Sequence, residues 1–212
     1  MNDSVRSTVR TRTRLLKAAA EVFATEGIEG ATTREIAQVA GVNEVTLFRH
    51  FPSKDELLGA VVQQVMALQQ AEALSHQQQW TQDLLIDLKH YAWVYNTILE
   101  EHEALIVTFM GEAKRRPEVA HRVILEAVQP LREKLITYLR DAQERGTVRQ
   151  DVDPEVAIDL FAGMLLSGML RRCFGAIPMS YSRESYIESC VSIFVHGIST
   201  FEASARHLSQ IQ

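Results

Sequence analysis

The stretch from Thr32 to Leu58 (TTREIAQVAGVNEVTLFRHFPSKDELL) constrains the fold of this 212-residue chain more than any other segment. Either Thr32 or Thr33 is placed to cap a short helix, and Asn43 is a favoured cap for a second helix that follows at once. Gly41, between them, suits the left-handed backbone conformation that ends a helix. The stretch is therefore expected to form two short helices joined by a tight turn.

Apolar spacing indicates how these two helices pack. Ile36, Ala37 and Ala40 give the first helix an apolar face at three- and four-residue spacing. Leu47 and Phe51, four residues apart, would bury the second helix against the first. This arrangement is the helix-turn-helix pattern, in which the second helix lies in the major groove of DNA.

The run from Gly41 to Leu58 also resembles the signature of the TetR family of bacterial transcriptional regulators. The matching features are a Gly-Val-Asn turn, Thr-Leu-Phe, His-Phe, and a Lys-x-x-Leu that opens the next helix. The resemblance implies an all-α chain of about nine helices, which the helical periodicity of the chain supports. A three-helix DNA-binding domain in residues 1–55 would be joined by a long helix to a helical ligand-binding and dimerisation domain in residues 56–212.

Helical periodicity also extends over the rest of the chain. Residues 1–9 are expected to be a disordered lead, and Ser53 is placed to cap a long helix that would act as a lever between the two domains. Gly27 and Gly146 are placed to end helices. Outside the helix-turn-helix, helices are expected at residues 11–25, 54–74, 81–96, 101–115, 117–145, 154–173 and 183–206.

Charge is distributed unevenly along the chain, although its formal net charge is −5. Residues 1–55 carry eight Lys and Arg against seven Asp and Glu, so the N-terminal part is slightly basic. A cationic arm beside a helix-turn-helix favours contacts with DNA phosphates, and a solvated tail that aids solubility is the alternative. The cations of the arm are Arg6, Arg10, Arg12, Arg14 and Lys17, opposed by Asp3.

Outward residues of the second short helix are the candidates for DNA contact. Arg49 could donate to a phosphate or bidentately to guanine, and Thr46 could reach a phosphate or a thymine methyl. Asn43 and Glu44, at the start of that helix, could meet base edges. The predicted DNA-binding residues are Thr33, Arg34, Asn43, Glu44, Thr46, Phe48, Arg49, His50 and Lys54.

The family resemblance implies phosphate contacts for four of these residues. Phe48, His50 and Lys54 would lie along the DNA backbone on one side, and Thr33 with the N–H groups of its helix would do so on the other. Packing of His50 against the first helix of the chain is the alternative for that residue. Two residues depart from the family pattern: Phe48 replaces the usual Tyr and lacks its hydroxyl, and Val45 replaces Gly, Ala or Pro.

The two C-terminal helices are too apolar for a single packed face. Between Leu160 and Leu170 the chain is apolar over nearly the whole helical circumference, and small residues there allow another helix to approach closely. We expect a homodimer whose interface is a four-helix bundle from both subunits; a buried central helix in a monomer is the alternative. The predicted interface residues are Gly163, Ser167, Ile187, Cys190, Val191, Phe194 and Ile198.

Aromatic and methionine side chains of the C-terminal part could line an apolar cavity, although such stripes are more often plain core. Together these features predict a repressor that binds a palindromic double-stranded operator and is released by a small, apolar or aromatic effector. Alternatives are a ligand-independent or architectural DNA-binding dimer controlled by a protein partner, and a helical enzyme, which the scarcity of inward titratable residues disfavours. The predicted pocket residues are Tyr91, Trp93, Tyr95, Phe109, Met110, Met164, Met169 and Phe174.

Metal and cofactor sites are not expected. Asp83, Asp87 and His90 have a spacing that could bring three ligands together, but they lie opposite the apolar face of their helix and are expected to be solvated. Cys173 and Cys190 lack metal or redox spacing and are expected to be reduced, buried thiols of a cytoplasmic protein. No membrane segment, cofactor motif or catalytic motif is expected.

Overall fold

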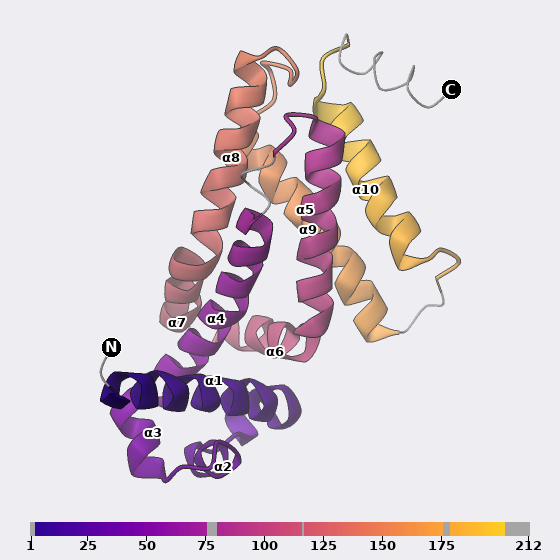
Figure 1. The fold of residues 1–212 in the computed structure, drawn as a ribbon. Coiled ribbons are helices and arrows are strands. Elements are labelled where there is room, and N and C mark those ends of the chain that lie inside the picture. The colour runs from indigo at the N-terminus through magenta and orange to yellow at the C-terminus, as the bar shows by residue number, and fades with distance from the viewer. Residues whose placement is uncertain (1–2, 76–79, 116, 176–178, 202–212) are drawn as a thin grey trace. The chain divides into compact units, whose positions relative to one another are not determined.

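The structure, a computed structural model, describes residues 3–75, 80–115, 117–175 and 179–201. Within these ranges it contains helices and no strand, apart from an isolated bridge between Val148 and Ser199, so the predicted all-α fold is confirmed (Figure 1). The elements are α1 (Asp3–Gly30), α2 (Thr33–Val39), α3 (Glu44–His50), α4 (Lys54–Ser75), α5 (Leu84–Glu101), α6 (Glu103–Ala113), α7 (Pro117–Val123), the π-helical turn η2 (Ile124–Val128), α8 (Gln129–Glu144), α9 (Pro154–Phe174) and α10 (Arg183–Ile198).

Contacts divide the chain into two compact units. The first unit contains Met1–Leu68 and His102–Gln129, and the second contains Gln69–Glu101 and Pro130–Gln212. The chain therefore passes from the first unit into the second within α4, and it returns to the first at α6. The functional boundary predicted after residue 55 stays a prediction.

The first unit is built on the apolar stripe of α1. Leu15, Ala19 and Phe23 are completely buried, and α1 contacts both α2 and α6. The helix begins earlier than predicted, because residues 3–26 contain neither Gly nor Pro to interrupt it. The lead that was predicted to be disordered is therefore helical from Asp3 onward. The regular backbone of α1 breaks at the predicted residue, Gly27, whose φ is 70°.

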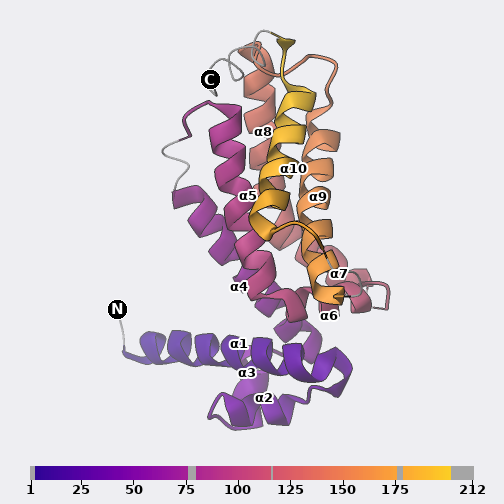
Figure 2. The same ribbon diagram turned by 90° about the vertical axis from the view of Figure 1, so that its right-hand side faces the viewer.

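The second unit has its core among α5, α8, α9 and α10. The helices α5, α9 and α10 contact one another in pairs, as Figures 1 and 2 show, and α8 contributes side chains to the same core. Phe161 and Leu165 of α9 and Leu139 of α8 are completely buried in it. One apolar face of α9 is therefore buried in the core of its own unit.

Two predicted helix boundaries in the C-terminal part are wrong. The helix predicted over residues 117–145 is interrupted by η2. Pro130 explains the interruption, because it has no N–H to donate to the carbonyl of Glu126 and its ring would clash with that carbonyl. The last helix, predicted to reach residue 206, ends at Ile198, because Ser199 adopts an extended conformation and bridges to Val148. Residues 202–206 lie outside the described ranges.

The residues Asp83, Asp87 and His90 do not share a solvated face, contrary to the prediction. His90 is exposed, but Asp87 is buried. The Oδ1 atom of Asp83 accepts from the N–H groups of Leu85 and Ile86 at 2.9 and 3.1 Å, so this side chain caps α5. Across the described ranges, no group of three or more His, Cys, Asp and Glu side chains is arranged to hold a metal ion.

Four donors compensate for the burial of Asp87. Its Oδ1 accepts from the N–H and the hydroxyl of Thr81 at 3.0 and 2.9 Å. Its Oδ2 accepts from the N–H of Gln82 at 3.0 Å and from the hydroxyl of Tyr138 at 2.7 Å. Burial and the hydrogen bond to Asp87 raise the pKa of Tyr138. The carboxylate of Asp87 thus connects residues 81–82, which precede α5, with Tyr138 on α8.

Replacing this carboxylate should measurably destabilise the protein. Asp87→Asn is expected to lower the free energy of unfolding by about 2–3 kcal/mol, because charge-assisted hydrogen bonds are lost and an amide NH2 faces other donors. Urea unfolding measures the change. The control is Glu188→Gln, which removes an exposed carboxylate paired with Lys89 at 2.8 Å and should cost less than about 0.5 kcal/mol. Equal losses in both variants would contradict the role of Asp87.

Candidate nucleic-acid interface

Two capping residues define the helix-turn-helix, as predicted. The Oγ1 atom of Thr32 accepts from the N–H of Glu35 at 3.1 Å and caps α2, and the Oδ1 atom of Asn43 accepts from the N–H of Thr46 at 2.7 Å and caps α3. Gly41 lies between the two helices with a φ of 64°, in the left-handed region. Because a cap satisfies N–H groups that the helix itself leaves unbonded, Asn43 determines where α3 begins.

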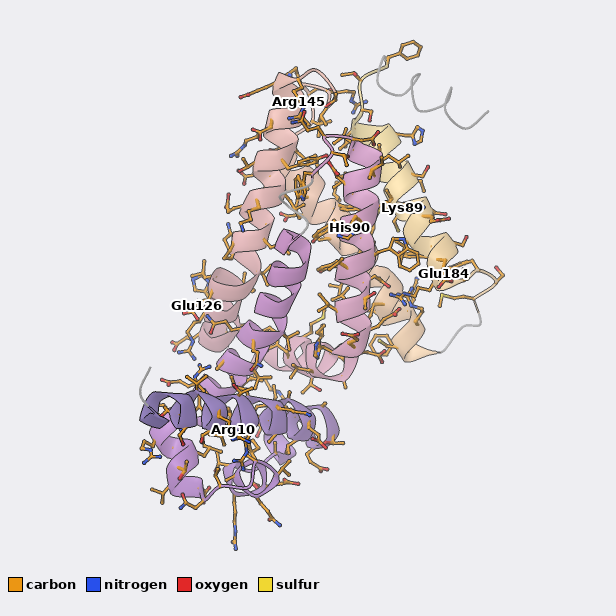
Figure 3. The ribbon with its side chains drawn as sticks, in the orientation of Figure 1. Arg10, Lys89, His90, Glu126, Arg145 and Glu184 are labelled. Atoms are coloured by element: carbon orange, nitrogen blue, oxygen red, sulfur yellow. The ribbon has the colours of Figure 1, made fainter. Side chains whose placement is uncertain are left out.

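Arg14 of α1 holds this turn in place. Its Nη2 atom donates to the carbonyl of Ala40 and to the carbonyl of Gly41, the latter at 3.1 Å. A cation is favourable at the C-terminal end of α2, where helix carbonyls point outward. Arg14, Arg10 (Figure 3) and Lys17 are all exposed residues of α1, but Arg14 is held by these bonds to the turn.

One side of α3 is buried and the other is open to solvent. Leu47 and Phe51 expose 0% and 3% of their surface, whereas Val45 and Phe48 expose 79% and 44%. Arg49 is also exposed. The open side of α3 therefore carries an aliphatic, an aromatic and a cationic side chain.

Val45 was not among the predicted DNA-binding residues, although the sequence carries a signal for it. It stands two residues before Leu47, and two residues rotate by about 200° on an α-helix. The burial of Leu47 therefore requires Val45 to point outward. A large aliphatic residue at the position where the resembling family has Gly, Ala or Pro was the second signal.

Three predicted contact residues are tied by hydrogen bonds within the protein. The hydroxyl of Thr33 donates to Oε1 of Glu44 at 2.6 Å, which joins α2 to the start of α3. The Nζ atom of Lys54 donates to the carbonyl of Ala31 at 2.8 Å. These bonds orient α3 and α4. A phosphate near Thr33 would have to share the single hydroxyl donor, whereas the ammonium of Lys54 has three N–H groups and the bond to Ala31 uses one of them.

His50 is half-buried at the end of α3. Its ring centroid lies 6.4 Å from that of Phe51, and the guanidinium of Arg12 lies 5.0 Å from the Phe51 ring centroid. Burial and the nearby cations Arg49 and Arg12 lower the pKa of His50. The imidazole is thus held toward its neutral form. Of the other predicted residues, Arg34 and Asn43 are exposed and Thr46 is half-buried.

The predicted ligand-pocket residues are divided between the two units. Phe109 and Met110 lie on α6 in the first unit, and the other six belong to the second. There Tyr91 and Tyr95 stack with ring centroids 5.6 Å apart, and burial raises the pKa of Tyr95 to about 12. Met169 is completely buried, Trp93 and Met164 are half-buried, and Phe174 exposes 65% of its surface. These six side chains therefore differ widely in their access to solvent.

The predicted dimer residues also separate into two groups. Gly163 and Ser167 are exposed on α9. The other five are buried in the core of the second unit: Ile187, Cys190, Val191, Phe194 and Ile198. Helical periodicity locates an apolar face correctly, but it does not tell whether the chain's own helices or a partner cover that face. Among the described helices, none combines the length and apolar character that crossing a bilayer requires.

Comparison with known proteins finds relatives of both parts of the chain. The family model "Bacterial regulatory proteins, tetR family" matches residues 15–61, and "Tetracyclin repressor-like, C-terminal domain" matches residues 79–174. The uncharacterized HTH-type transcriptional regulator YvkB of Bacillus subtilis is 29% identical over 191 residues, which are 89% of this chain and 97% of the relative. The HTH-type transcriptional regulator UidR of Escherichia coli K12 is 29% identical over 168 residues, which are 73% of this chain and 80% of the relative.

Solved structures share the fold of the chain at lower sequence identity. The structure of the fatty acid degradation regulator FadR from Bacillus halodurans has a TM-score of 0.73 and 20% identity, and the match covers 87% of this chain and 94% of that one. At this identity the likeness supports the arrangement of the helices, namely an N-terminal helix-turn-helix followed by a helical C-terminal part.

Gly41→Ala tests the turn that positions α3. We expect a loss of about 1–2 kcal/mol in unfolding free energy, because a side chain is strained at positive φ. In addition, the new Cβ would lie 2.7 Å from Nη2 of Arg14, which must shift. The control, Gly111→Ala on α6, places a Cβ with nothing within 4 Å and should stabilise the protein by up to about 1 kcal/mol. Thermal unfolding that shows the same sign for both variants would contradict this account.

Proposed function

We propose that this chain, which belongs to the TetR family of bacterial helix-turn-helix transcriptional regulators, is a repressor. In this proposal a small molecule releases it from DNA. In this proposal residues 1–55 bind the DNA, and residues 56–212 hold the effector and the dimer contacts. A dimer presents two copies of α3, so its operator is a palindrome. The family and the relatives are transcriptional regulators rather than enzymes.

The open side of α3 is the observation that carries this proposal. Val45, the most exposed large apolar side chain of the helix, offers an aliphatic contact to a thymine methyl. Arg49 offers a guanidinium that can bind O6 and N7 of one guanine. Asn43 uses its Oδ1 for the cap of α3 and keeps its NH2 for a base edge or a phosphate. Together they supply an apolar and two polar contacts to a major groove.

Phosphate contacts in this proposal come from residues around α3. Arg10 and Lys17 of α1 and Arg34 of α2 are exposed cations, and each neutralised phosphate strengthens binding in a salt-dependent way. His50 would add a contact, since a neighbouring phosphate favours the charged imidazole that burial and cations disfavour in the free protein.

A dimer surface on α9 and α10 is part of the proposal. Val156, Leu160, Gly163 and Ser167 are all exposed on α9, at spacings of four, three and four residues, which is the seam spacing of packed helices. On α10, serines, Glu184 and Glu188 line an open, shallow hollow of about 570 Å³ beside the exposed side chain of Ile193. This seam, rather than the buried residues of α10, is the surface that a second copy would cover.

The effector is proposed to bind in the second unit, where aromatic side chains of α5 gather. The stacked rings of Tyr91 and Tyr95 favour an apolar or aromatic molecule. The second candidate function is a ligand-independent DNA-binding dimer controlled by a protein partner. It requires that no small molecule alters the affinity for the operator.

Arg49→Ala tests sequence-specific DNA binding. The probe is a palindrome from the promoter nearest the protein's own gene, with a scrambled duplex for comparison, at two salt concentrations. We expect the variant to bind the palindrome about 10- to 100-fold more weakly, because a bidentate base contact is lost. Arg140→Ala removes the same charge from α8 and should change the affinity less than about twofold. Equal, salt-sensitive binding of the unaltered protein to both duplexes would refute specific recognition and favour an architectural role.

Leu160→Asp tests the dimer seam. Light scattering after size-exclusion chromatography should show a dimer for the unaltered protein and a monomer for the variant, because a carboxylate would be buried at the interface. Leu160 exposes 62% of its surface, so the monomer should stay folded. The matched control is Ile86→Asp, at a residue of α5 that is 56% exposed and lies outside the seam. A dimer that survives Leu160→Asp would rule out this surface.

A further inference from the structure

A cluster of polar side chains, with the buried Asn96 at its centre and half-buried groups around it, lies where the end of α5 meets the end of α9 and the start of α10. It consists of Asn96, Thr97 and Glu100 of α5 with Arg172 of α9 and Arg183 of α10, and we refer to it as the Asn96 cluster. Asn96 exposes 0% of its surface. Such a buried polar group is stable only when its donors and acceptors are satisfied.

Each acceptor group of the Asn96 cluster has at least one partner. The Oδ1 atom of Asn96 accepts from Nη2 of Arg172 at 2.9 Å and from Nε of Arg183 at 3.3 Å. The carboxylate of Glu100 forms ion pairs with the same two nitrogen atoms, at 2.9 and 3.1 Å. The hydroxyl of Thr97 accepts from Nη2 of Arg183 at 2.8 Å.

Two donors of the cluster are left over. The Nδ2 atom of Asn96 and the Nε atom of Arg172 are buried, and neither finds an acceptor among the described residues. Rotating the amide of Asn96 by 180° does not help, because its NH2 would then face the guanidinium donors. Since both leftover groups are donors, the cluster lacks an acceptor.

The net charge of the Asn96 cluster and the side chains around it indicate which chemical group could be that acceptor. Within the cluster two guanidinium groups face one carboxylate, that of Glu100. Glu184 also interacts electrostatically with both arginines, but it is exposed, so solvent screens its charge. One further negative charge inside the cluster would therefore balance the second guanidinium. A carboxylate has two acceptor oxygens and suits both an amide and a guanidinium donor. Apolar side chains adjoin the cluster on one side: the Arg183 guanidinium lies 5.4 Å from the ring centroid of Trp93, and Met169, three residues before Arg172, is completely buried.

We propose that the Asn96 cluster binds the carboxylate of the effector, which is a monocarboxylate with an apolar body. This inference rests on the proposed ligand-responsive function and names the chemical class of its ligand. Asn96 and Arg172 donate to the carboxylate through Nδ2 and Nε. The incoming group uses a different nitrogen of Arg172 from Glu100, but it competes with the Glu100 carboxylate for the positive charge of that guanidinium. Glu100 lies one residue before the end of α5, where the chain passes into the first unit. Binding therefore alters the segment that links the two units.

The test uses the full-length, isotope-labelled protein and four probe molecules. Octanoate and benzoate carry the carboxylate, and 1-octanol and benzyl alcohol are their neutral counterparts. We expect both carboxylates to shift the nuclear magnetic resonance signals of the Asn96 side-chain NH2 and the Arg172 Nε–H, and the alcohols to leave them in place. Unchanged signals, or equal shifts with acids and alcohols, would overturn the proposal and indicate that water or the chain's own carbonyl groups satisfy these donors.

Variants separate carboxylate recognition from general electrostatics. Asn96→Asp keeps an acceptor for the two arginines but replaces the leftover donor by a repelling oxygen, and Arg172→Lys keeps the charge but removes the Nε–H. Each should weaken benzoate and octanoate at least tenfold. Lys89→Gln makes the same charge change as Asn96→Asp at an exposed residue of α5 (Figure 3) and should change affinity less than twofold. Equal loss in Lys89→Gln would overturn the proposal.

Failure of this inference and failure of the proposed function give different results. Without any probe, the unaltered protein and the Lys89→Gln control should both prefer the operator palindrome, because Lys89 lies outside the Asn96 cluster and in a different unit from α3. Loss of palindrome preference in the unaltered protein would refute the regulatory function, whereas loss of carboxylate binding alone would refute only the ligand class. Thermal unfolding of each variant confirms that the comparison is made on folded protein.

Discussion

The burial of Leu47 is the interaction on which the proposed DNA-binding surface depends. Leu47 is completely buried, and so are Ile36 and Leu15 of the other two helices in this core. With that side of α3 held inward, helical geometry turns Val45 and Arg49 outward. The caps at Thr32 and Asn43 then settle the ends of α2 and α3, so the exposed side chains stand on a rigid element.

The second unit contains two buried polar groups with opposite hydrogen-bond balances. Asp87 is an acceptor surrounded by four donors, so it is fully satisfied and strengthens the fold. Asn96 and Arg172 have donors left over, and each such buried group costs about 1–3 kcal/mol when unsatisfied. A ligand that brings a hydrogen-bond acceptor would remove this cost. The difference between the satisfied Asp87 and the unsatisfied Asn96 and Arg172 is the reason for the ligand proposal.

Much of the first unit could be predicted because its signals are local. The cap residues, the turn at Gly41 and the buried spacing of Leu47 and Phe51 all lie within one short stretch, where each residue's neighbours along the chain are also its neighbours in space. The second unit was harder to predict from the sequence. Its helices were found from periodicity, but the solvated face assigned to Asp87 was wrong, since its partner Tyr138 lies far away in the sequence.

Local patterns along the chain were enough to predict the all-α fold, the helix-turn-helix and the outward position of Arg49 on α3, because helix periodicity and capping act over a few residues. Three features became visible only in the folded chain: Ile187 and Val191 of α10 face their own core, Thr33 bonds Glu44, and the buried side chain of Asn96 has donors without an acceptor. Each of these outcomes depends on which distant residues come together. Hydrophobic burial and hydrogen-bond satisfaction are set by neighbours in space, and periodicity along one helix contains no information about them.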